Sequence, residues 1–171
     1  MKKTWLLPTM LFPYLIILLF ALFFGLGEAG YGAFQGKFLD NIAVVGIGLL
    51  AYIVLAAVLN IVYLMGTRKE DYADRLKAAL LVKCVQIPAY VLIFLFGLLL
   101  GLTFFMTLPL ILILVITDYI TLWLGDMVSI PALVKGWKEK SAKPALLIAA
   151  LIAQFFFCAD IISLFVLKKA K

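Results

Sequence analysis

The sequence contains no histidine, only two cysteines and few charged residues. The absence of histidine excludes imidazole-ligated metal sites, Ser–His and Cys–His catalysis, and haem held by His. Cys84 and Cys158 lie in separate apolar segments and form no CxxC pair, so we predict two buried thiols. We expect no metal and no cofactor. Charged residues make up 14% of the chain, against about 25% in soluble domains, which is too few to cover a globule in water.

Hydrophobic residues are abundant instead. They make up 67% of the chain and the mean hydropathy is +1.20, whereas an average soluble domain is about 45–50% apolar. This composition excludes a soluble enzyme, a disordered chain, a collagen and a disulfide scaffold. We therefore predict an integral membrane protein that is not an enzyme, with residues 1–171 forming a single domain.

Five apolar stretches are long enough to cross a bilayer. A hydrocarbon core of about 30 Å needs about 20 apolar residues in a helix. Backbone groups cannot be left unpaired in lipid, so these stretches are expected to be helices. The expected spans are about 5–27, 41–65, 79–101, 107–131 and 145–167. The predicted fold class is an all-α bundle of five transmembrane helices.

Lysine and arginine are distributed unevenly between the expected loops. With the N-terminus in the cytoplasm, eleven of them lie inside and four outside, which is the bias that cytoplasmic loops show. We expect a multi-pass protein of the bacterial inner membrane with its C-terminus outside, although Lys168, Lys169 and Lys171 there oppose the bias. The net charge of +6 indicates contact with anionic lipid headgroups, not nucleic acid.

The third helix is expected to begin outside the membrane. Thr67 and Glu70 have the spacing of a capping box, in which the two side chains satisfy the first N–H groups of a helix. The helix would then start close to Thr67 and run directly into the span at 79–101.

Two motifs have alternative interpretations. Residues 25–30, Gly-Leu-Gly-Glu-Ala-Gly, match GxGxxG, but a dinucleotide site needs a strand before this pattern and a helix after it. At the end of a membrane helix the pattern predicts a loop. Gly125-Asp126 and Pro131-Ala132-Leu133 resemble motifs of intramembrane aspartyl proteases. However, Trp123 replaces the first glycine of that motif, and the Pro-Ala-Leu element follows too soon in the sequence.

Asp118 and Asp160 are the most informative ionisable residues inside the expected spans. A charge at this depth costs at least about 2.5–3.5 kcal/mol, so it needs a partner or water. At about 1.5 Å per residue, Asp118 lies roughly 24 Å and Asp160 roughly 22 Å from the cytoplasmic end. Their similar depth gives the hypothesis that they share a proton or a cation along a polar path, together with Gln154 and Thr121. Depth alone does not fix which way the two side chains face.

A second polar cluster is expected nearer the cytoplasm. Lys83 lies roughly 7 Å and Asp126 roughly 12 Å from that end, close enough in depth to pair. Gln86 and Asn60 lie at a similar depth. The alternative for both clusters is structural, because buried polar groups also hold membrane helices together, typically by about 0.6 kcal/mol each.

Two segments carry a resemblance to a protein family. They are 125–136, Gly-Asp-Met-Val-Ser-Ile-Pro-Ala-Leu-Val-Lys-Gly, and 154–163, Gln-Phe-Phe-Phe-Cys-Ala-Asp-Ile-Ile-Ser. Together they resemble the C-terminal part of small uncharacterised polytopic membrane proteins of Gram-positive bacteria. The resemblance covers the last third of the chain. It implies that the regions around Asp126 and Asp160 form a recurring unit, and it implies no activity.

Three functions follow from these residues. The first is transport or permeation of a small solute or ion, which predicts a water-filled path to Asp118 and Asp160. The second is an accessory or assembly subunit, which predicts a dry bundle and an apolar face of small residues for a second copy or another membrane protein. The third is an intramembrane protease, which predicts two aspartates sharing one water molecule.

Overall fold

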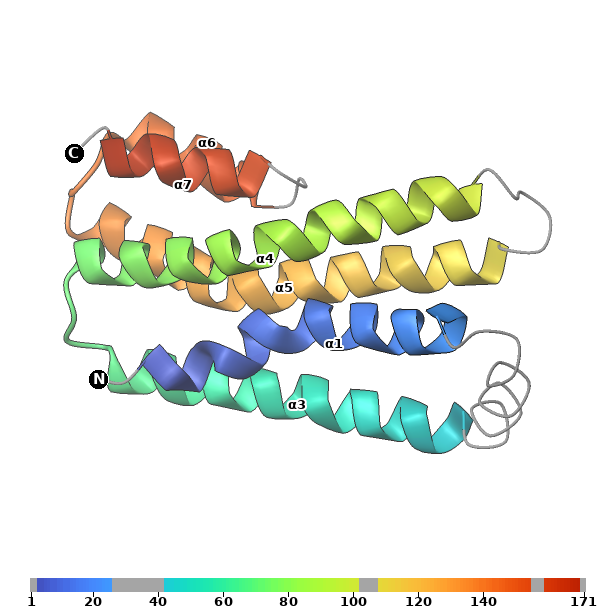
Figure 1. Cartoon of the computed structure of the whole chain (residues 1–171). Helices are drawn as coiled ribbons and strands as arrows, with labels where there is room; N and C mark the ends of the chain where they lie inside the picture. The colour runs from blue at the N-terminus through green and yellow to red at the C-terminus, as the bar shows by residue number, and fades with distance from the viewer. Residues whose placement is uncertain (1–2, 26–41, 102–107, 155–158, 170–171) are drawn as a thin grey trace.

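The computed structural model describes residues 3–25, 42–101, 108–154 and 159–169 (Figure 1). Within these ranges every regular element is helical, so the predicted all-α class is confirmed for this part of the chain. The GxGxxG pattern lies almost entirely outside the described residues. So do Lys37, Cys158 and Lys171.

Four helices run side by side and form the body of the protein (Figure 1). They are α1 (Leu7–Gly25), preceded by the 3-10 turn η1 (Lys3–Leu6), α3 (Ile42–Gly66), α4 (Tyr72–Gly101) and α5 (Leu108–Lys138). Each is long and apolar enough to cross a membrane. The first four expected spans therefore correspond to helices, and their length and apolar composition indicate a membrane protein. Large apolar side chains such as Val44 and Ile47 are exposed, as a lipid-facing surface requires.

The fifth expected span, 145–167, does not form a single helix. Its residues belong to two short helices, α6 (Pro144–Ala153) and α7 (Ala159–Lys169), which lie antiparallel to each other (Figure 1). Ten or eleven residues extend only about 15 Å, half of a bilayer core. We call this pair the hairpin. The hairpin packs along one half of α4 and α5. Within it, α7 contacts α4 and α6 contacts α5.

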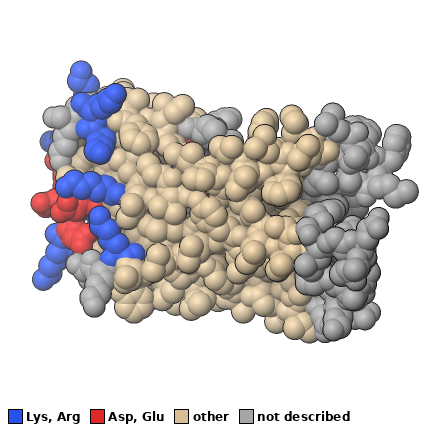
Figure 2. Space-filling model, in the orientation of Figure 1, with Lys and Arg blue, Asp and Glu red and all other residues tan. Residues whose placement is uncertain are grey.

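The hairpin also changes the expected topology. Because α7 runs back along α6, it ends at Lys169 on the side of the molecule where η1 begins (Figure 1). Lys3 and Lys169 therefore lie at the same end of the helical bundle (Figure 1), whereas the five-span topology placed them at opposite ends. Lys168 and Lys169, in the last turn of α7, therefore lie at the end of the molecule (Figure 1) where lysine and arginine gather (Figure 2). We call this the basic end; it contains Lys3, Arg68, Lys69, Arg75, Lys77, Lys135, Lys138, Lys140, Lys143, Lys168 and Lys169.

The start of α4 is determined by tertiary contacts. The Thr67 hydroxyl donates to the carbonyl of Tyr63 in the last turn of α3, so Thr67 ends one helix and does not cap the next. The expected capping box is wrong. The Tyr72 N–H at the start of α4 instead donates to Glu139, 3.2 Å away. A carboxylate there stabilises the positive end of the helix dipole.

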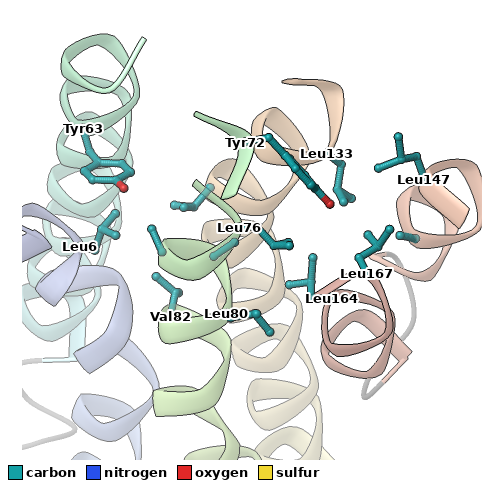
Figure 3. Packing of buried hydrophobic residues seen from close by; sticks show 14 of the residues in the cluster. Leu6, Tyr63, Tyr72, Leu76, Leu80, Val82, Leu133, Leu147, Leu164 and Leu167 are labelled. Carbon is teal, nitrogen blue, oxygen red and sulfur yellow. The ribbon is translucent and has the colours of Figure 1, made fainter. Parts of the chain in front are cut away.

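A cluster of buried apolar residues, in the half of the protein nearest the basic end, joins the hairpin to the bundle (Figure 3). Buried side chains from α4 and α5, such as Leu76 and Leu133, share one cluster with Leu147 of α6 and Leu164 of α7. Packing is tight at Gly136, where a β-carbon would lie 2.6 Å from the Tyr72 ring. The hairpin therefore shares an apolar core with α4 and α5, which themselves approach each other closely at Gly136.

Candidate functional site: a buried ionic cluster

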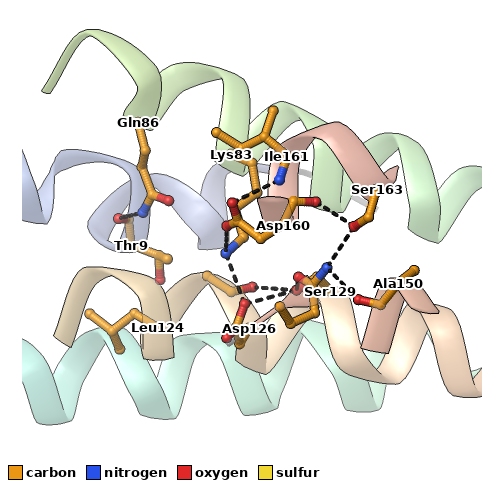
Figure 4. A network of polar contacts seen from close by, with 12 residues as sticks. Thr9, Lys83, Gln86, Leu124, Asp126, Ser129, Ala150, Asp160, Ile161 and Ser163 are labelled. Atoms are coloured by element: carbon orange, nitrogen blue, oxygen red, sulfur yellow. Dashed lines mark hydrogen bonds and ion pairs between the residues drawn. The ribbon is translucent and has the colours of Figure 1, made fainter. Parts of the chain in front are cut away.

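Three ionisable side chains meet inside the bundle (Figure 4). Lys83 of α4 donates from Nζ to Asp126 Oδ1 of α5 over 2.8 Å. The same Nζ lies 2.6 Å from Asp160 Oδ2 of α7, a close ion pair whose angles fall outside those of a hydrogen bond. The exposed fractions of the three side chains are 0%, 7% and 1%. We call Lys83, Asp126 and Asp160 the ionic cluster.

Neutral polar groups extend the ionic cluster into the hairpin (Figure 4). The Ser129 hydroxyl of α5 donates to Gln154 Oε1 at the end of α6 over 2.7 Å. Gln154 in turn donates to the carbonyl of Ala150 and to the hydroxyl of Ser163. The Asp160 carboxylate also accepts from the N–H of Ile161 at 2.7 Å, in the first turn of α7, where negative charge is favoured.

Gly125 makes room for the lysine. A β-carbon at this position would lie 3.0 Å from Lys83 Cε and 3.3 Å from Gln86 Oε1. Both distances are shorter than ordinary van der Waals contact. The smallest residue therefore stands on α5 where the Lys83 side chain crosses from α4, one position before Asp126.

A second, uncharged cluster lies beside the first (Figure 4). Thr9 of α1 donates to Asn60 of α3 over 2.8 Å, and Asn60 donates to the carbonyl of Leu124 over 3.0 Å. Gln86 donates to the backbone carbonyl of Thr9 over 2.9 Å. That carbonyl is available because Pro13, four residues further along α1, has no N–H to donate. We call Thr9, Asn60 and Gln86 the neutral cluster.

The structure brings together some of the expected residues and separates others. The expected pair of Lys83 and Asp126 is present. Asn60 and Gln86 lie close by but bind Thr9, not the ion pair. Gln154 is buried, as part of the hairpin.

The expected pairing of Asp118 with Asp160 is wrong. Asp160 pairs with Lys83, at the level of Asp126, and Asp118 lies eight residues before Asp126 on α5, about 12 Å away along the helix. Asp118 Oδ1 has no hydrogen-bond partner among the described residues. Thr121, which was expected on the same path, donates to the carbonyl of Thr117 in its own helix.

The depth predicted for Asp160 was wrong because the prediction assumed one continuous helix over 145–167. Counted from Pro144 at about 1.5 Å per residue, Asp160 would lie near the far side of the membrane. Because α7 runs back along α6, Asp160 lies less deep, at the level of Asp126. Hydropathy did not reveal this turn because the apolar stretch 145–167, taken as a whole, is long enough for one span.

Thr9, Gly125 and Ser129 were not predicted as members of these clusters. Thr9 and Ser129 carried one usable signal, a hydroxyl within an apolar run, which needs a partner in lipid. For Thr9 the proline four residues later was a second signal, because it leaves a backbone carbonyl free. Gly125 gave no such signal, since its role depends on which helix lies opposite.

The ionic cluster contains more negative than positive charge. With all three groups ionised its net charge is −1, and binding one proton or one monovalent cation makes it neutral. A net charge buried in this environment costs several kcal/mol. Among the described residues, no group of three or more His, Cys, Asp or Glu side chains could hold a metal ion. With a net charge of −1, the ionic cluster could bind one proton or one monovalent cation.

Comparison with known proteins gives a family but no activity. The sequence profile of one family, described as a family of unknown function (DUF6652), matches residues 3–171. This match extends over nearly the whole chain, whereas the expected resemblance covered only its last third. Searches of curated proteins and of solved structures found no match. The chain therefore belongs to DUF6652, a family of unknown function.

Proposed function

We propose that the protein is a proton-coupled transporter of a small solute or ion, and that the ionic cluster carries the proton. The observation that supports this is one lysine facing two aspartates, with exposed fractions between 0% and 7%. Ionisable groups at membrane depth mark proton and ion pathways in many membrane proteins. The proposed path differs from the expected one, since Asp126 takes the place of Asp118.

The charge count defines two states of the site. With one proton bound, the cluster is neutral and suits a dry interior. Without that proton it carries a net negative charge, which water or a cation must solvate. Loss of the proton therefore favours an arrangement in which the cluster is open to solvent.

The hairpin is the element whose movement would open the cluster. It carries Asp160, and its contacts with the bundle are mainly with α4 and α5. The Asp160 ion pair is also the less well aligned of the two that Lys83 makes. Movement of α7 away from α4 would separate Asp160 from Lys83 while Asp126 kept its hydrogen bond.

We place the basic end in the cytoplasm of a bacterial inner membrane. The positive-inside rule supports this orientation. With Lys168 and Lys169 at the same end as the N-terminal helix, the bias is stronger than the five-span topology allowed. Both termini would then be cytoplasmic.

The protease hypothesis receives no support from the site. An aspartyl protease needs two carboxylates around one water molecule. Here Lys83 Nζ lies between Asp126 and Asp160, within 2.8 Å of both carboxylates. A fixed ammonium in that place would occupy the position of the catalytic water.

Infrared spectroscopy of the purified protein tests the bound proton. We expect a protonated carboxyl band in the wild type at neutral pH. Asp126→Asn and Asp160→Asn each leave one carboxylate beside one ammonium, which is neutral without a proton, so either variant should lose the band. Asp118→Asn, on the same helix as Asp126, is the control and should keep the cluster's band. A wild type without any band attributable to Asp126 or Asp160 would contradict the proposal.

A flux assay tests transport itself. In proteoliposomes with an internal pH dye, the wild type should carry protons when a pH gradient is applied with candidate solutes. Asp160→Asn should lower the flux at least tenfold while the protein stays folded by circular dichroism. Asp118→Asn should keep the flux within about twofold. Flux unaffected by Asp160→Asn would exclude the ionic cluster as the carrier.

One observation favours the alternative of an accessory or assembly subunit. A groove of about 300 Å³ on the hairpin is lined partly by small residues, among them Ala149, Ala153, Ala159 and Ser163, and partly by larger apolar ones such as Leu146 and Ile162. Small residues allow another membrane helix to approach closely. Under this alternative the folded wild type gives no flux, and Ala153→Leu, which fills the groove, changes its oligomeric state in detergent.

A further inference from the structure

A cationic pocket lies at the basic end, away from the ionic cluster. Its volume is about 420 Å³. Four cationic side chains line it, namely Arg68, Arg75, Lys135 and Lys138, with Glu139 as the acidic one. The ionised pocket therefore carries a net charge of +3. It lies between the turn that joins α3 to α4 and the last turns of α5.

Two of these cations hold the turn in place. Arg75 donates from Nε and Nη2 to the carbonyl of Thr67, at 3.2 and 2.7 Å. Lys135 donates to the carbonyls of Arg68 and Glu70 and lies 3.4 Å from Glu139. The contacts with backbone carbonyls fix the wall of the pocket without changing its charge, and Glu139 offsets only one of the four cations.

The other two cations are available to a ligand. Arg68 and Lys138 are exposed, and neither side chain has a hydrogen-bond or ion-pair partner among the described residues. Arginine presents a planar fork that binds two phosphate oxygens, and lysine adds a point charge. The pocket thus offers a preformed site for a phosphoryl group.

The remaining wall is apolar. Pro131 and Val134 line the same pocket, and both belong to the membrane-length segment of α5 that ends at Lys138. Val134 is 40% exposed. An anion that carries an acyl chain could place its phosphate among the cations and its chain along this wall. A free phosphate would leave the apolar wall uncovered.

From this combination we propose that the pocket binds the phosphoryl headgroup of one anionic phospholipid molecule. The pocket lies where four membrane-length helices reach the basic end, and Figure 2 shows lysine and arginine gathered there. Headgroups of a surrounding bilayer lie at this level. The site does not depend on transport, so it holds whether or not the ionic cluster carries protons.

Lipid titration of the purified protein in uncharged detergent tests this site. Native mass spectrometry counts bound phosphatidylglycerol, and thermal unfolding reports its effect on stability. We expect one tightly bound molecule per chain and an increased unfolding temperature. Arg68→Gln with Lys138→Gln should weaken binding about thirtyfold, given what two basic residues contribute at an anionic membrane surface.

The matched control removes the same charge from the same end. Lys77→Gln with Lys143→Gln changes two basic residues that do not line the pocket, and should change binding by less than about threefold. An equal loss in both double variants would replace the pocket by diffuse attraction. Equal stabilisation by inorganic phosphate would assign the site to a free anion, and equal binding of phosphatidylcholine would reduce it to an apolar contact. Each of these results overturns the proposal.

Discussion

The two buried polar clusters lie side by side and differ in charge and in the helices that they join. The neutral cluster joins α1, α3, α4 and α5, the four membrane-length helices, through three amide and hydroxyl hydrogen bonds. The ionic cluster joins α4 and α5 to the hairpin. Uncharged groups thus join the four long helices to one another, whereas the hairpin is joined to α4 and α5 by charged groups in addition to apolar and neutral polar contacts.

The difference matters because the two kinds of contact respond differently to protons. An amide–hydroxyl bond has the same strength across ordinary pH, whereas an ion pair depends on the protonation of its carboxylates. A bundle that must stay assembled suits the first kind. The movement of the hairpin that we propose would need the second kind.

Among the variants that test this difference, substitution of Lys83 should cause the largest loss of stability. Lys83→Met leaves two buried carboxylates without their cation, which costs about 3–5 kcal/mol. This loss is measured as the change in the free energy of unfolding in detergent micelles. Adding Asp126→Asn and Asp160→Asn removes the uncompensated charge and should recover more than half of the loss. No recovery in the triple variant would show that the packing of the lysine stem matters more than its charge.

Gly125→Ala should affect both clusters by a smaller amount. The new methyl group would press on Lys83 Cε and on Gln86 Oε1, and such overpacking costs about 1–3 kcal/mol. Gly97→Ala on α4 is the matched control, because a β-carbon there would have no neighbour within 4 Å. The two unfolding temperatures give the comparison. Equal effects at Gly125 and Gly97 would contradict the close approach of Lys83.

Thr9→Val should weaken the neutral cluster alone. It removes the hydroxyl that donates to Asn60 and keeps the shape of the side chain, so the expected loss is about 0.6–1.7 kcal/mol. The loss should be the same at pH 5 and pH 8 when the free energy of unfolding is measured at both. A loss that varies with pH would show that the two clusters are coupled.

The smallest effect is expected at Glu139, outside the spans. Partial desolvation raises the pKa of the Glu139 carboxyl, but hydrogen bonds from the Tyr72 N–H and from Lys135, with the Lys135 charge, outweigh it and lower the pKa from its ordinary value. A lowered folded pKa stabilises the protein above the ordinary value, and this is lost as pH falls through the folded value. Glu139→Gln should therefore flatten the dependence of the unfolding temperature on pH below about 4.5. An unchanged acid dependence would exclude Glu139 as a cap of α4.

Much of the architecture was predictable because bilayer physics acts on local sequence. An apolar run of about 20 residues in lipid must form a helix, whatever lies next to it. Four of the five runs did so, and α4 and α5 extend beyond them at the basic end, where charged residues can reach water. The depth argument also predicted the Lys83–Asp126 pair, because both residues lie on continuous helices and a buried lysine needs a carboxylate.

Only the tertiary structure determined the hairpin, and with it the second carboxylate of the ionic cluster. Sequence alone established a helical membrane protein with acids inside its apolar segments. It could not distinguish one long helix over 145–167 from two short ones, because the apolar stretch is long enough for either. The tertiary structure selects the two short helices, because the antiparallel arrangement brings Gln154 within hydrogen-bond distance of Ser129 and Asp160 beside Lys83. A buried charge is stable only beside its partner, and that partner lies 77 residues away in the sequence.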